Sequence, residues 1–85
     1  MRPSKLFQRI AENPTNVDFR DLVRVVEAFG FRLERVSGSH RMYRHAATRE
    51  KLNLQPLGKQ AKPYQVRQFM SVVETYNLKI QDAET

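Results

Sequence analysis

The sequence predicts an α+β domain in which two main helices flank three antiparallel strands, with an extra short helix at the N-terminus. Apolar residues recur at i, i+3, i+4 and i+7 in residues 18–30 and again in residues 63–77. Between these segments, three short runs, residues 31–36, 39–45 and 51–55, have the period of two that is typical of strands. Two helices covering one face of such a sheet would leave the other face open for a partner.

Residues 4–12 are predicted to form the extra helix, with Ser4 as a possible N-cap. Its apolar residues share one face: Leu6, Phe7 and Ile10. Asn13 and Pro14 should end it, because the residue before a proline is pushed out of the α region. The pattern leaves open whether this arm, residues 1–17, packs on the core.

The first main helix has clear signals at both ends. Asp18 is a plausible N-cap, Asp21 favours the positive end of the helix dipole, and Gly30 supplies a left-handed stop. The last helix should begin at Pro63, whose missing N–H is no loss in a first turn, and end at Asn77.

Three short strands are expected between the helices, at residues 31–36, 39–45 and 51–55. Ser37 and Gly38 are predicted to form the hairpin turn, whereas residues 56–63 are predicted to be a loop. In the second strand, His40 and Met42 should share one face, and Arg41 and Tyr43 the other.

The whole chain is expected to be a single domain over residues 1–85, with its core in residues 18–78 and a frayed tail in residues 79–85. The predicted buried residues are Leu22, Val25, Val26, Phe29, Phe31, Leu33, Leu52, Leu54, Val66, Phe69, Met70 and Val73.

Positive charge is concentrated in the middle of the chain. The net charge is +6; residues 31–67 hold nine basic against two acidic side chains, or +7, whereas residues 1–30 hold +1 and residues 68–85 hold −2. Such a concentration favours a polyanionic partner, most often nucleic acid, although a solvated basic face is the plain alternative. Few aromatic side chains accompany it, so a base-stacking platform is only weakly indicated.

Several classes of protein are disfavoured. The chain has no cysteine, which excludes disulfides and thiolate metal sites and fits a reducing cytoplasm. We expect no membrane span and no secretory signal, because the longest apolar runs are very short. We also expect no metal site, because His40 and His45 should point to opposite faces of a strand. No phosphate-binding glycine loop or nucleophile elbow occurs.

His40, in the basic segment, is the remaining candidate for chemistry. Cleavage of RNA needs no cofactor, because an imidazole near neutral pH can accept the proton of the 2′-OH or protonate the leaving oxygen. Nearby cations would hold the phosphate. The nearest candidates are Arg41, Arg44, Lys59 and Lys62. A lone histidine beside a turn is more often a capping or packing residue, so the residues alone favour RNA binding over RNA cleavage.

The runs GFRLERVSGSHRMYRH, LNLQP and GKQAKPYQVRQF closely resemble the HicA family of toxins from bacterial toxin–antitoxin systems. The resemblance extends from about Asp18 to Leu78, and its strongest part is Gly30 through Tyr43. It implies a double-stranded-RNA-binding-domain-like fold and a metal-independent ribonuclease that cleaves messenger RNA and arrests translation and growth. A cognate HicB-type antitoxin, with an acidic-to-neutral surface that covers the active face, is the implied protein partner.

The resemblance also assigns roles to residues. His40 would be the catalytic histidine, and Gly38 and Ser39 the turn that positions it. The residues expected to contact RNA are Arg35, Gly38, Ser39, Arg41, Arg44, Lys59 and Lys62. Many family members carry a second histidine in a Pro-x-His stretch, where this chain has Gln55-Pro56-Leu57-Gly58. If a second proton donor is needed, Lys59 or Lys62 is the first candidate to replace that histidine, and His45 is the next. Otherwise, water would protonate the leaving group.

Three hypotheses follow: a toxin ribonuclease, a non-catalytic RNA-binding module on the same fold, and an interaction protein whose basic face docks an acidic partner. The first is preferred. Loss of activity on replacing His40 would separate it from the others, and a steep fall of RNA affinity with salt would separate the second from the third.

Overall fold

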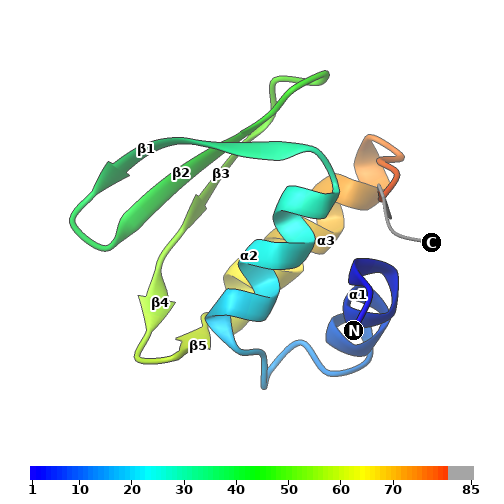
Figure 1. Cartoon of the computed structure of the whole chain (residues 1–85), viewed down its shortest axis with the longest axis vertical. Helices are drawn as coiled ribbons and strands as arrows, with labels where there is room; N and C mark the ends of the chain where they lie inside the picture. The colour runs from blue at the N-terminus through cyan, green and yellow to red at the C-terminus, as the bar shows by residue number, and fades with distance from the viewer. Residues whose placement is uncertain (81–85) are drawn as a thin grey trace.

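The computed structural model describes residues 1–80 and has the predicted order of helices and strands (Figure 1). Its elements are α1 (Pro3–Glu12), α2 (Phe19–Ala28), β1 (Phe31–Ser37), β2 (His40–His45), β3 (Lys51–Leu54), β4 (Pro56–Leu57), β5 (Gln60–Ala61) and α3 (Pro63–Thr75). The arrangement is α+β with the double-stranded-RNA-binding-domain-like layout, preceded by one extra helix. The end of the predicted tail, residues 81–85, lies outside the described residues.

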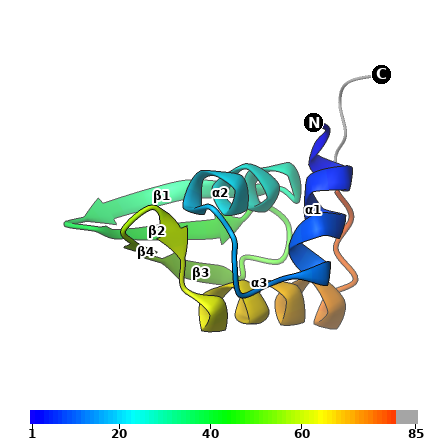
Figure 2. The ribbon, with the colours of Figure 1, turned by 90° about the horizontal axis from the view of Figure 1, so that it is seen from below.

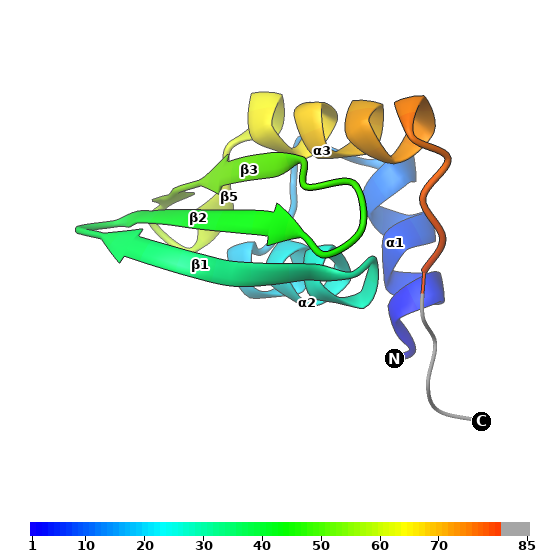
Figure 3. The ribbon, with the colours of Figure 1, turned by 90° about the horizontal axis from the view of Figure 1, so that it is seen from above.

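Strands β1, β2 and β3 form an antiparallel sheet in that order, and α2 and α3 lie on one side of it (Figures 1 and 3). Helix α2 contacts β1, and α3 contacts β3. The β1–β2 hairpin projects beyond the helices, and α1 crosses the opposite end of the helix layer (Figures 2 and 3). The hairpin turn therefore lies far from the most densely packed part of the molecule.

The predicted helix signals at the main helices are confirmed. The Asp18 side chain accepts a hydrogen bond from the backbone N–H of Arg20 at 2.9 Å, as an N-cap does. Gly30 has a φ of +100° directly after α2, and Asn77 has a φ of +52° after α3. Pro63 is the first residue of α3.

The N-terminal arm packs on the core. Leu6 and Ile10 of α1 are buried, and the Phe7 ring meets the Phe29 ring edge-on with centroids 4.8 Å apart. The predicted cap was wrong, because α1 begins at Pro3 and Ser4 therefore lies within the first turn. A proline is well suited to that first position, since no hydrogen bond is expected of its nitrogen.

Most of the predicted core is buried, but Leu33 is not: it is 46% exposed. The pairing of β1 with β2 shifts between Leu33 and Arg35, which is a β-bulge, and every residue of β1 after Phe31 is exposed. Edge position and bulge together take the outer part of β1 away from the helices. Met70 and Val73 of α3 are only partly buried against the core.

Two turn predictions also needed correction. Ser37 pairs with His40, so the hairpin loop is Gly38–Ser39 and not Ser37–Gly38. Gly38 has a φ of +61° at the first loop position, where a type II′ turn favours glycine.

The predicted loop at residues 56–63 contains the small hairpin β4–β5. This hairpin is held against the start of α2, because the Ala61 N–H donates to the Val17 carbonyl at 2.8 Å and the Phe19 N–H donates to the Lys59 carbonyl at 2.9 Å. Its partner is the segment before α2, a distant pairing that short-range alternation does not reveal.

Because α1 contributes to the core, Ile10→Ala is expected to lower the free energy of unfolding by about 2–4 kcal/mol, through lost burial and the cavity left behind. Gln8→Ala, on the exposed side of the same helix, should change it by less than about 0.5 kcal/mol. Urea denaturation of both variants checks this. Equal stability of the two would show that α1 does not contribute to the folded core in solution.

Candidate functional site

His40 is exposed at the first position of β2, immediately after the Gly38–Ser39 loop. The regular pairing of β2 places it on the opposite face from Arg41 and Tyr43, as predicted. Tyr43 is buried on the helix side, and its burial raises the pKa of its hydroxyl. His40 therefore stands at the tip of the projecting hairpin, on the side of the sheet away from the helices, where a large polymer can reach it.

A chain of hydrogen bonds links the turn before His40 to the start of α3. The Gln55 side-chain amide donates through Nε2 to Ser39 Oγ at 3.0 Å. Its Oε1 accepts from Lys62 Nζ, also at 3.0 Å. One glutamine side chain thus connects the hairpin turn with a lysine, although the three residues are well separated along the chain.

The position of Gln55 is itself fixed by α3. The backbone N–H of Gln55 donates to Oε1 of Gln65 at 3.0 Å, and the Gln65 side chain is buried in the first turn of α3. Sequence reasoning missed both glutamines as site residues. A polar residue that follows the last apolar position of a strand, and a glutamine in the first turn of the next helix, were the only signals available.

Two other predicted cations lie at the same end of the fold. The Arg41 guanidinium lies over the Phe19 ring at the start of α2, with its carbon 5.6 Å from the ring centroid. Lys59 is exposed in the β4–β5 turn, and its carbonyl accepts from the Phe19 N–H. Of the two candidate lysines, Lys62 is the one linked to the hairpin turn, because the Gln55 side chain bonds both Lys62 and Ser39.

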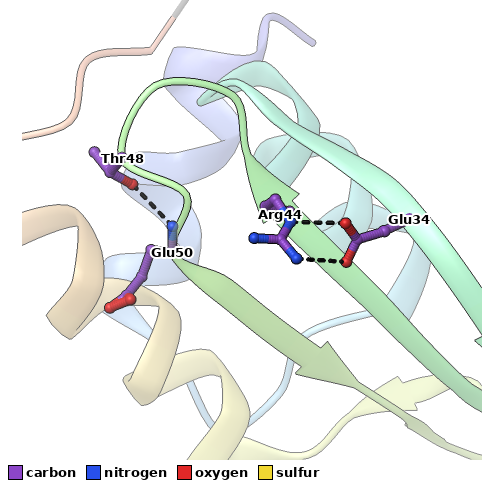
Figure 4. A network of polar contacts seen from close by, with 4 residues as sticks. All are labelled: Glu34, Arg44, Thr48 and Glu50. Carbon is purple, nitrogen blue, oxygen red and sulfur yellow. Dashed lines mark hydrogen bonds and ion pairs between the residues drawn. The ribbon is translucent and has the colours of Figure 1, made fainter.

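Arg44 lies further along the sheet and is already engaged (Figure 4). Its Nε donates to Glu34 at 2.7 Å and its second nitrogen at 3.3 Å, a two-point ion pair. This hydrogen bond is the main cause that lowers the pKa of Glu34, and the charges of Arg44, Lys51 and Arg35 act in the same direction. Arg35 is exposed beyond the bulge.

His45 has the opposite character from His40. It is buried, and its Nε2 lies 2.9 Å from the Phe29 carbonyl while Nδ1 accepts from the backbone N–H groups of Ala47 and Thr48 at 3.1 Å. A backbone carbonyl can only accept, so Nε2 carries a hydrogen and donates it to the Phe29 carbonyl. His45 therefore shapes the β2–β3 loop. Because both its nitrogens are occupied, it is not available to replace the missing second histidine as a proton donor.

The same loop is braced by neighbouring polar contacts. Thr48 Oγ1 accepts from the Glu50 N–H at 3.2 Å (Figure 4), and the Tyr76 hydroxyl donates to the Glu50 carboxylate at 3.0 Å. A Cβ at Gly30 would lie only 3.1 Å from His45 Nε2, and the φ of +100° at this position is strained for any other residue. The residues around His45 therefore have structural roles.

Within residues 1–80, the structure brings together no group of three or more histidine, aspartate or glutamate side chains that could hold a metal ion. Over the same residues, no helix is both long and apolar enough to cross a membrane.

The fold and the site define a basic α+β domain that presents an exposed histidine on a hairpin turn. A family model described as the HicA toxin of bacterial toxin–antitoxin systems matches residues 19–74, well over half of the chain. The chain belongs to the HicA toxin family, and a toxin of this kind implies an antitoxin partner. Comparison with curated proteins and with solved structures returned no match.

The two histidines should respond differently to removal. We expect His45→Ala to lower the free energy of unfolding by about 2–4 kcal/mol, because it leaves a cavity and unpaired backbone groups. His40→Ala should change it by less than about 0.5 kcal/mol, since the ring is exposed. Urea denaturation of both variants, followed by circular dichroism, checks this. An equal loss in the two variants would contradict the assignment of His45 as the structural histidine.

Proposed function

We propose that this HicA-family toxin is a metal-independent endoribonuclease that cleaves messenger RNA, with His40 as the catalytic residue. The observation that carries the proposal is the exposure of His40 at the tip of a projecting hairpin, next to Ser39, which Gln55 links to Lys62. The surplus of positive charge in residues 31–67 supports a phosphate-rich substrate.

The reaction uses the nucleophile that RNA carries itself. His40 accepts the proton of a 2′-OH as that oxygen forms a bond to the adjacent phosphorus, and the bond from phosphorus to the 5′ oxygen breaks. The products are a 2′,3′-cyclic phosphate and a 5′-OH end, whose oxygen takes a proton from water or from a protonated side chain. No oxidant, reductant or metal is needed for this balance.

Negative charge that builds on the phosphate oxygens needs donors held in place. Lys62 is the best placed of the two candidate lysines, because its ammonium is fixed by Gln55 at the turn that carries His40. Arg41 supplies a second cation at this end, held over Phe19. Arg44 is a weaker candidate, since Glu34 already offsets its charge.

The antitoxin of this toxin is proposed to be of the HicB type and to cover the face that carries His40. The +7 surplus of residues 31–67 would require an acidic-to-neutral surface on that partner. The same surface would then exclude RNA from His40 while the toxin is bound.

The proposal predicts that the purified protein cleaves a labelled single-stranded RNA in the presence of EDTA and that His40→Ala is about 10²- to 10⁴-fold slower, the range that a positioned general base contributes. His40→Ala should remain folded, which circular dichroism checks. Gln68→Ala, an exposed change on α3, serves as the control purified in parallel. Equal cleavage by native and His40→Ala protein would assign the activity to another residue or to a contaminant.

Binding should survive the loss of the histidine. We expect His40→Ala to bind the same RNA within a few-fold of the native affinity, because one neutral imidazole adds little to phosphate binding, and the affinity should fall steeply between 50 and 200 mM salt as counterions are released, by roughly tenfold or more. Fluorescence anisotropy measures both. Binding without cleavage in the native protein would favour the non-catalytic RNA-binding module, and salt-insensitive or absent binding would favour a pure interaction protein.

A further inference from the structure

We propose that Gln55 is a positioning residue that turns Ser39 Oγ–H and the Lys62 ammonium into a pair of donors for one RNA phosphate beside His40. The inference rests on the proposed function and deepens it, by naming the residues that hold the reacting phosphate. The geometry that points to it is the continuous chain from Ser39 through the Gln55 amide to Lys62.

The orientation of the Gln55 amide follows from its partners. A lysine ammonium has three hydrogens to donate and no lone pair to accept with, so the Gln55 oxygen must face Lys62. The NH₂ group of the same amide must then face Ser39. Lysine thus removes the usual ambiguity between the oxygen and nitrogen of a glutamine side chain.

This orientation decides what the Ser39 hydroxyl can do. Because Oγ accepts a hydrogen bond from Gln55, its own hydrogen points elsewhere and remains available to an acceptor. Ser39 is exposed in the turn directly before His40, so an RNA phosphate at His40 is a suitable acceptor. A partner that accepted from Ser39 would instead consume that hydrogen.

Lys62 likewise retains donors for an anion. Its charge is held by a neutral amide oxygen and not by a carboxylate, and its two remaining N–H bonds are not used by Gln55. It is also the N-cap residue of α3, and the first turn of α3, within the described chain, holds no acidic side chain. A cation at the positive end of a helix dipole is electrostatically unfavourable by itself, and a bound phosphate would relieve this.

The shape-preserving change Gln55→Glu tests the role of the amide. A carboxylate would offset the charge of Lys62 and would accept the Ser39 hydrogen, so Lys62 would attract a phosphate less and Ser39 would lose its free donor, while the side-chain volume stays the same. We expect kcat/KM for cleavage to fall roughly ten- to hundredfold, the value of one or two charge-assisted hydrogen bonds, with the melting temperature unchanged or higher. Gln55→Ala should lower kcat/KM by a smaller factor, because it frees both donors without occupying them.

Ser39 provides an independent variant in an exposed loop, where folding is not at risk. Ser39→Ala should lower kcat/KM about tenfold, and Ser39→Thr, which keeps the hydroxyl, should restore most of it. The matched control is Gln60→Ala. Gln60 also donates through Nε2 at 3.0 Å, to Asn16 Oδ1, but that bond involves neither Ser39 nor Lys62. Gln60→Ala should cleave within twofold of the native protein.

A binding measurement separates this inference from the proposed function. In the non-cleaving His40→Ala background, Gln55→Glu and Lys62→Ala should each weaken the affinity for single-stranded RNA and reduce the slope of log affinity against log salt by about 0.7, the value of one phosphate contact on a single strand. This readout does not require cleavage, so it reports on the phosphate contact even if His40 proves not to be catalytic.

The outcomes are distinct. Loss of activity in Gln55→Glu at full thermal stability, with the reduced salt slope, supports the positioning role. Native-like kcat/KM in Gln55→Glu and Ser39→Ala, or losses that follow the melting temperature and spare the salt slope, would overturn it and leave Gln55 as a structural link only. If His40→Ala cleaves as well as the native protein while the salt slopes change as expected, the proposed mechanism fails and the phosphate contact stands.

Discussion

The aromatic packing around Phe69 is the interaction on which the rest of the structure depends. Its ring meets those of Phe29 and Phe31 edge-on, with centroids 5.5 and 6.2 Å apart, and that of Phe7 at 6.2 Å. Phe7 lies in α1, Phe29 directly follows α2, Phe31 begins β1 and Phe69 lies in α3, so one cluster joins every helix to the sheet. An 85-residue chain can bury only one modest core, and three of these rings are part of it, with Phe7 packed against them.

The turn of the β1–β2 hairpin lies outside this core, because residues 32–41 are all exposed. Burial in the hairpin is confined to its inner part, at Phe31, Tyr43 and His45, so the geometry near the turn is set by pairing and by polar contacts. Gln55 supplies the contact that anchors the turn, because its side chain holds Ser39 while its backbone is held by the buried Gln65. A side chain on a poorly packed hairpin needs such an anchor to keep a defined position.

Much of the fold could be predicted from the sequence because its signals are local. Asp18, Gly30 and Pro63 act within one turn of their own positions, and the period of the apolar residues separates helix from strand. Leu33 was predicted wrongly because alternation assumes a regular strand, whereas a bulge and an edge position are decided by the partner strand. The hairpin β4–β5 was not predicted for a related reason, since it is held by the segment before α2, which is distant along the chain.

The candidate site, too, could be predicted from the sequence only in part. His40 could be found from the sequence because a basic segment, a turn and a family resemblance converge on it. Gln55 could not, because its importance lies in joining Ser39 to Lys62, and nothing in the sequence places those two residues together. The family resemblance implies a second histidine near Gln55-Pro56-Leu57-Gly58, and this stretch has none. Lys62, close to it along the chain, is held by a neutral amide oxygen and keeps its positive charge, whereas a carboxylate partner, like that of Arg44, would have offset it.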